Sequence, residues 1–303
     1  MLKRFITYIL LFAGIAASAS TTDNELIPRP VPPDTLMNLQ PRCDFIVNRF
    51  WDRTNFEQAI LFPEQLNTAF GEFTAVLPLA SADTVHAAID RLLARVSKSG
   101  PQTLRLAELA ESWMYSDTSQ YRSEETYLPF AKAAANNKKI SKADKSRFAA
   151  QTKVIETSGL GAIVPDLKFI RPDGSKGSLA EADKGSVLIF INEPDCADCN
   201  MARVRLSADY NINQLIKSGE MTIVSIYPGE ADDEQWKNAV SSYPDTWIVG
   251  AMPDADLYFD LRDTPQFLFL NKEHKVLVKN VPVDHFLNAA YQVINSKNNR
   301  RNR

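Results

Sequence analysis

The chain has 303 residues, and 34 lysine and arginine side chains face 37 aspartate and glutamate side chains, for a formal net charge of −3. This balance excludes the broad positive field by which nucleic-acid-binding proteins attract their ligand, so partners must be recognised at a local site. Apolar residues make up 45% of the chain, which suffices for the cores of two domains and argues against a disordered chain.

The N-terminal residues have the pattern of a secretory signal peptide. Lys3 and Arg4 precede an apolar stretch over residues 5–16, and small residues at 17–19 form a cleavage site. The apolar stretch is short for a permanent anchor, because a membrane span needs about 20 residues. We therefore predict a cleaved signal peptide over 1–19, a periplasmic or secreted protein without stable membrane insertion, and a location that permits disulfides.

A helical region follows this segment. Residues 20–38 are rich in proline and polar side chains, which predicts an extended linker. Candidate helices then succeed one another up to residue 158, with a capping residue such as Ser81 at the start and a glycine such as Gly100 at the end. We predict an all-α domain of five or six helices over 39–158.

From residue 159 the pattern changes to strands that alternate with helices. A short hairpin comes first, and the buried strands SVLIF and MTIVSIY follow, separated by a predicted helix over 199–219. A second hairpin begins at QFLFLN, and a helix closes the domain. We predict an α/β domain with a mixed central sheet over 159–296, and a disordered tail over 297–303.

The three cysteines fall into one single residue and one pair. An odd number argues against a disulfide-stapled fold, and Cys43 on a helical segment is expected to pack as a small buried hydrophobe. Cys196 and Cys199 form a C-x-x-C pair where a strand meets a helix. The helix N-terminus lowers the pKa of Cys196, and Cys199 can attack a mixed disulfide formed there. Half of a zinc site and an inert disulfide clip remain as alternatives.

Residues 160–296 resemble thioredoxin-like domains of the TlpA and ResA type, which are exported disulfide oxidoreductases. The matching motifs are Val164-Pro165-Asp166, the Cys196-Ala197-Asp198-Cys199 centre, and Thr264-Pro265. The resemblance implies a cis peptide bond before Pro265 and a substrate-facing role for Thr264 and Pro265. The helical part, notably around FIVNRFWDRTNF, resembles a domain of unknown function that precedes such modules in secreted proteins of Bacteroidetes.

The sequence departs from that family beside the dithiol. Asp195 replaces a frequent tryptophan, and Ala202 stands where many relatives carry a carboxylate that accepts a proton. Glu193, Asp195 and Asp198 are then the candidate proton relay, although simple solvated loop charges are an equal interpretation. A carboxylate about 6 Å from the thiolate raises its pKa by about one unit at an effective dielectric of about 40. We predict a Cys196 pKa near or above about 7 and hence a reductant.

The sequence thus predicts an exported thiol–disulfide oxidoreductase that reduces disulfides in protein substrates. Cys196 is the nucleophile and Cys199 resolves the mixed disulfide. This chemistry requires no metal and no organic cofactor, but an external electron donor must reduce the pair again. The alternative is a non-catalytic binding module whose helical domain recognises a partner and whose C-x-x-C pair is a structural or redox-sensing disulfide.

Overall fold

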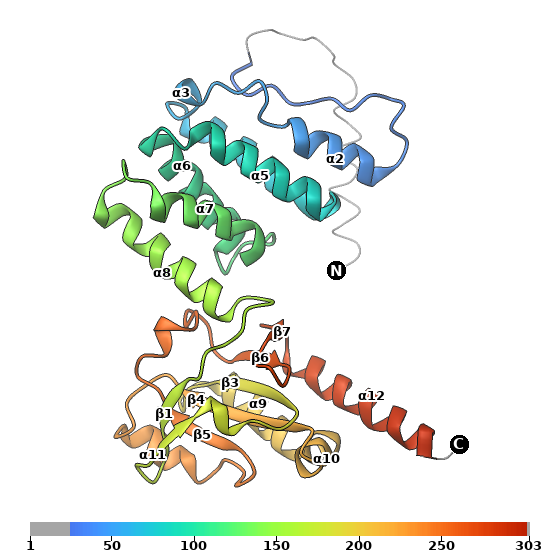
Figure 1. The fold of residues 1–303 in the computed structure, drawn as a ribbon, viewed down its shortest axis with the longest axis vertical. Coiled ribbons are helices and arrows are strands. Elements are labelled where there is room, and N and C mark those ends of the chain that lie inside the picture. Colours follow the sequence, from blue (N-terminus) through green and yellow to red (C-terminus); the bar gives the residue numbers. More distant parts are fainter. Residues whose placement is uncertain (1–24, 302–303) are drawn as a thin grey trace. The chain divides into compact units, whose positions relative to one another are not determined.

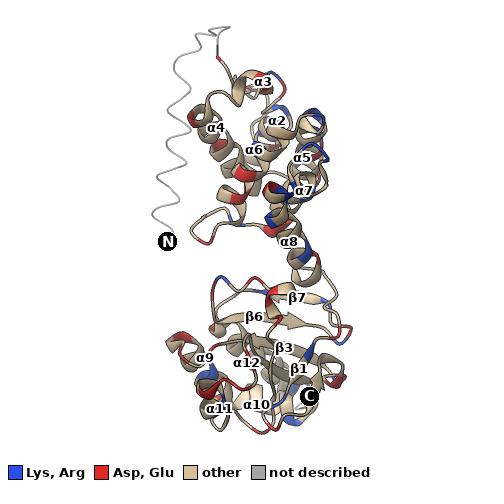
Figure 2. Cartoon of the chain, turned by 90° about the vertical axis from the view of Figure 1, so that its left-hand side faces the viewer, with Lys and Arg blue, Asp and Glu red and all other residues tan. Residues whose placement is uncertain are grey.

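The computed structural model describes residues 25–301 (Figure 1). The predicted signal peptide and its cleavage site lie outside the described residues. None of the helices in this part of the chain is long and apolar enough to cross a bilayer. The contacts divide the chain into two compact units, with the division after Val96. Basic and acidic residues are interspersed along the helices of both units (Figure 2).

The first unit is helical and has an aromatic core. Phe50, Trp51, Phe70 and Phe73 are buried, and neighbouring ring centroids lie 4.8–6.2 Å apart. Cys43 is a buried free thiol, as predicted, and its burial raises its pKa. The helices of this unit are α2 (Leu39–Arg49), α3 (Phe56–Ala59), α4 (Pro63–Val76) and α5 (Ala82–Val96).

The second unit begins with further helices. Ser123 and Ser141 cap two of them, because each side-chain oxygen accepts a hydrogen bond from a backbone N–H of the first turn. The helices are α6 (Gly100–Ala110), the π-helical turn η3 (Glu111–Tyr115), α7 (Glu124–Asn136) and α8 (Lys142–Ser158). The division after Val96 therefore falls within the region predicted as one helical domain.

A mixed sheet forms the rest of the second unit, as predicted. Its strand order is β2-β1-β5-β4-β3-β6-β7. The central strand β3 runs parallel to β4 and antiparallel to β6, and both predicted hairpins are present as β1–β2 and β6–β7. The strands are β1 (Lys168–Ile170), β2 (Lys176–Ser178), β3 (Ser186–Ile191), β4 (Met221–Tyr227), β5 (Ile248–Ala251), β6 (Gln266–Leu270) and β7 (Val276–Lys279).

Apolar side chains cover both faces of this sheet. Along β3, Val187 and Ile189 point into one core cluster, whereas Leu188 and Phe190 point into the other. The second cluster also contains buried residues of three helices, α9 (Ala197–Ala208), α10 (Tyr210–Lys217) and α12 (Val283–Arg301). The strand is buried on both sides, which explains its continuous apolar sequence.

The structure differs from the sequence analysis at three elements. The single helix predicted over 199–219 is broken at Asp209, which has extended backbone angles and whose side chain caps α10 by accepting from Ile212 N at 2.8 Å. Strand β5 was not predicted. Helix α12 runs to Arg301, into the segment expected to be a disordered tail, and Lys297 forms an ion pair there with Glu220. A short helix, α11 (Glu234–Val240), follows β4 as predicted.

Candidate active site

The dithiol lies at the junction of β3 and α9, and the two cysteines form a disulfide. Cys196 is the N-cap residue of α9, and its sulfur accepts a hydrogen bond from Cys199 N at 3.0 Å. Cys196 is partly exposed, whereas Cys199 is only 2% exposed. Of the two cysteines, Cys196 is therefore the one that is accessible from solvent. Among residues 25–301, no group of three potential ligand side chains could hold a metal ion.

The loop before β6 lies against this dithiol. The Thr264–Pro265 peptide bond is cis, as the family resemblance implied. The Thr264 carbonyl oxygen lies 3.7 Å from Cys196 Sγ, so a reduced Cys196 thiol has an acceptor at this position. Gln266, the first residue of β6, holds this loop in place. Its side-chain amide donates to the Asp263 carbonyl at 2.7 Å and also to the Asp260 carbonyl. We name residues 260–265 the cis-proline loop.

The three acids of the predicted relay occupy different environments. Glu193 is partly buried and accepts a hydrogen bond from the Thr264 hydroxyl at 3.4 Å, which places it at the cis-proline loop. Asp195 and Asp198 are exposed. Ala202 is buried among apolar side chains together with Cys199, so no carboxylate occupies that position. Of the three acids, Glu193 alone has a hydrogen bond to the site.

A neutral polar network lies at the end of β3, four residues before Cys196. The buried Asn192 amide donates to Ser225 Oγ at 2.7 Å, and the Tyr243 hydroxyl donates to Asn192 Oδ1. Burial raises the pKa of Tyr243, despite the Arg203 guanidinium 4.9 Å from its ring centroid. No local sequence pattern marks this network, because its members are up to 51 residues apart.

A charge cluster around the buried Asp260 holds the other end of the cis-proline loop. Asp260 accepts hydrogen bonds from Arg262 at 2.5 Å and from Arg122 at 3.3 Å. Burial opposes ionisation of Asp260, but the hydrogen bond and charge of Arg262 lower its pKa overall. Arg262 also lies over the Tyr115 ring, 4.1 Å from its centroid, and donates to the Tyr115 carbonyl at 3.1 Å. The segment between η3 and α7 is thereby fastened to the loop.

A second ion pair joins the start of α7 to the sheet. Lys279, at the end of β7, donates to both carboxylate oxygens of Glu124 at 2.8 and 3.0 Å. The two side chains are only 4% and 16% exposed, so the charges have little water around them. Glu124 also stands in the first turn of α7, where a carboxylate complements the helix dipole.

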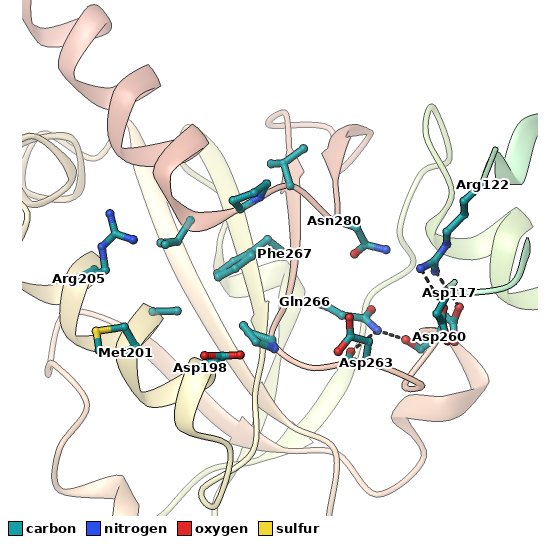
Figure 3. A pocket seen from close by; sticks show the side chains of 15 residues that line it. Asp117, Arg122, Asp198, Met201, Arg205, Asp260, Asp263, Gln266, Phe267 and Asn280 are labelled. Carbon is teal, nitrogen blue, oxygen red and sulfur yellow. Dashed lines mark hydrogen bonds and ion pairs between the residues drawn. The ribbon is translucent and has the colours of Figure 1, made fainter. Parts of the chain in front are cut away.

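A pocket of about 530 Å³ opens beside the cis-proline loop. We name it the proline pocket, after Pro265 in its wall. Figure 3 shows its lining side chains coming from α9, from the cis-proline loop and the start of β6, and from the segment that carries Asp117 and Arg122. Helix α9, which begins at the dithiol, thus supplies one wall. The connection between η3 and α7, which carries Asp117 and Arg122, supplies the opposite wall.

Comparison with known proteins confirms the resemblance to thioredoxin-like proteins. A crystal structure of a thioredoxin-like protein from Bacteroides caccae is 26% identical, with a TM-score of 0.72, and the match covers 88% of this chain and 98% of that chain. Residues 16–158 match a family described as a domain of unknown function, DUF5106. The N-terminal region therefore matches this domain of unknown function, and the C-terminal part is thioredoxin-like. With the Cys196–Cys199 disulfide, this fold supports a thiol–disulfide redox role in general terms.

Two further solved structures each match 44% of the chain. One is the C-terminal domain of an uncharacterized protein from Bacteroides fragilis, 27% identical over 96% of that chain, with a TM-score of 0.40. The other is the thioredoxin domain of a thiol-disulfide oxidoreductase from Bacteroides vulgatus, 21% identical over 96% of that chain, with a TM-score of 0.38. No curated protein matches this chain.

Proposed function

We propose that this thioredoxin-like protein is an exported thiol–disulfide oxidoreductase that reduces disulfides in protein substrates, as TlpA and ResA relatives do. The observation that carries the proposal is the position of Cys196, which is partly exposed at a helix N-terminus, bonded to Cys199, and 3.7 Å from the Thr264 carbonyl oxygen. Export is supported by the signal-peptide pattern of residues 1–19.

The first step is attack on the substrate. In the reduced protein the Cys196 thiolate attacks one sulfur of a substrate disulfide, a Cys196–substrate bond forms, and the other substrate sulfur leaves as a thiolate. The N–H of Cys199, which lies 3.0 Å from Cys196 Sγ, stabilises the attacking thiolate. Thr264 and Pro265 lie in the bend before β6, beside this sulfur, where a substrate chain would pair.

The second step releases the substrate. The Cys199 thiol loses its proton and attacks Cys196 Sγ, so the mixed disulfide breaks and the second substrate sulfur leaves as a thiolate. The product is the Cys196–Cys199 disulfide. Glu193 is the favoured proton acceptor among the three acids, because it alone is hydrogen-bonded to the cis-proline loop. A Glu193→Gln variant should therefore release substrate from the mixed disulfide more slowly than the wild type.

An external dithiol must return two electrons to the disulfide after each turnover. The exposed carboxylates of Asp195 and Asp198 beside Cys196 oppose its ionisation, which destabilises the reduced form and favours electron flow towards the substrate. Titration of the reduced protein should give a Cys196 pKa near or above about 7. A pKa below about 5 would contradict the reductase direction.

Insulin reduction in the presence of dithiothreitol tests the activity. The wild-type protein should accelerate precipitation of the insulin B chain, and Cys196→Ser should reduce the rate to that of dithiothreitol alone. Cys199→Ser should trap substrates as mixed disulfides, which identifies them. No acceleration by the wild type, together with an empty trap, would support instead a binding module with a structural disulfide.

A further inference from the structure

We propose that the proline pocket binds a lysine or arginine side chain of the substrate protein, adjacent in sequence to the cysteine that Cys196 attacks. This inference deepens the proposed function and rests on it. It follows from the position of the pocket, from its apolar lining, and from the charges that remain unpaired at its rim.

The pocket lies where the residues flanking the attacked cysteine must pass. Pro265 lines it, and Thr264, the residue before, has its carbonyl oxygen 3.7 Å from Cys196 Sγ. Asp198 and Met201 line it from the first turns of α9, only a few residues after the reactive sulfur. A substrate chain that runs along the cis-proline loop would therefore place a neighbouring side chain in this pocket.

The lining offers an apolar surface for the stem of a long side chain. Phe267 is buried at the base, and Pro265, Val281 and Pro282 add apolar contacts. The volume of about 530 Å³ leaves room for a side chain and part of its backbone. Lysine and arginine bury their methylene stems against such surfaces and keep the charged group at a polar rim.

Most charges around the pocket are neutralised within the protein. Arg122 pairs with Asp117 at 2.9 Å and with Asp260 at 3.3 Å, and Arg205 pairs with Asp284. Asp260 forms a further ion pair with Arg262. These groups contribute structure but little net field to the pocket.

Two carboxylates at the rim have no such partner. Asp198 and Asp263 are exposed and lie in the lining, and neither forms an ion pair within residues 25–301 (Figure 3). The buried amide oxygen of Gln266, in the same wall, has no hydrogen-bond donor in this part of the chain. The pocket therefore presents unpaired negative potential, which favours a cation.

The test compares two peptides that contain one disulfide and differ at the residue beside one cysteine, which is lysine in one and glutamine in the other. Each rate is divided by the rate with dithiothreitol alone, which removes intrinsic differences in disulfide reactivity. The two exposed carboxylates together predict about a fivefold preference in kcat/KM for the lysine peptide at low salt.

Asp263→Asn should lower this preference to about twofold, because one of the two carboxylates is removed. Asp256→Asn is the matched control: it removes the same charge from an exposed residue outside the pocket and should leave the preference unchanged. Equal rates for both peptides with an active wild type would overturn the inference and leave the proposed function standing. Failure to reduce either peptide would overturn both.

Discussion

The charged residues on the two sides of the cis-proline loop are organised differently. On the helical side, Asp260, Arg122 and Arg262 are partnered, and Asp260 is buried. On the dithiol side, Asp195 and Asp198 are exposed and form no ion pair within residues 25–301. The comparison teaches that pairing and burial fix the position of the loop, whereas unpaired charge is left where it can act on the sulfur and on a substrate.

The largest effect is expected from breaking the most buried pair. Glu124→Gln leaves the Lys279 ammonium, which is 4% exposed, without its counterion. The free energy of unfolding should fall by about 3–5 kcal/mol, measured by urea denaturation, because an isolated buried charge is costly.

The double variant Glu124→Gln with Lys279→Met is the control for this prediction. Removing both charges should recover most of the loss, because no buried charge is then left unpaired. A double variant as unstable as Glu124→Gln would show that the side chains matter for packing and not for charge.

Asp260→Asn should have a smaller effect, about 2 kcal/mol, because the released arginines are partly exposed and can bind water. The substitution should also remove the part of the pH dependence of the free energy of unfolding that comes from Asp260. The pKa of Asp260 is lowered in the folded protein, so its stabilisation is present above its unfolded pKa of about 3.9 and is lost as pH falls through the folded value. Wild-type stability should thus decline below about pH 4 more steeply than that of the variant.

Asp198→Asn tests the unpaired side of the comparison. Removal of this carboxylate should lower the pKa of Cys196 by about 0.5–1 unit, since less negative charge opposes the thiolate. The pH dependence of iodoacetamide alkylation of the reduced protein measures the shift. Asp256→Asn should leave the pKa in place, and an equal shift in both variants would indicate a nonspecific effect of net charge.

The smallest effect is expected where a pair is exposed. Lys132 and Glu156 lie 2.7 Å apart on α7 and α8, but their side chains are 43% and 50% exposed. Lys132→Met should change the free energy of unfolding by at most about 0.5 kcal/mol in urea denaturation. A loss comparable to that of Asp260→Asn would show that burial is not what separates the strong pairs from the weak.

Local patterns predicted much of the fold. The continuous apolar run of β3, the first hairpin and the C-x-x-C after a strand each depend on residues close in sequence. Strand β5 escaped prediction because its four residues follow an irregular segment and pair only with distant strands. The break at Asp209 was missed because apolar residues continue on both sides of it, although aspartate before a helix is a capping signal.

The residues of the site that belong to short sequence motifs could be predicted. Those that meet only through contacts between distant segments could not. Cys196 and Thr264 come from short motifs, and the structure brings them together. The contact of Arg122 with Asp260 spans 138 residues, and that of Glu124 with Lys279 spans 155. Charged residues are common on every surface, so their pairing depends on the tertiary fold and leaves no local signal.

The contrast in exposure between the two sulfurs has a consequence for oxidative damage. Hydrogen peroxide can reach Cys196 and convert it to a sulfenic acid, while Cys199 is covered. The neighbouring thiol then condenses with that sulfenic acid, expels water and restores the disulfide before sulfinic acid accumulates. The buried Cys199 thereby keeps Cys196 in oxidation states that a thiol can reverse.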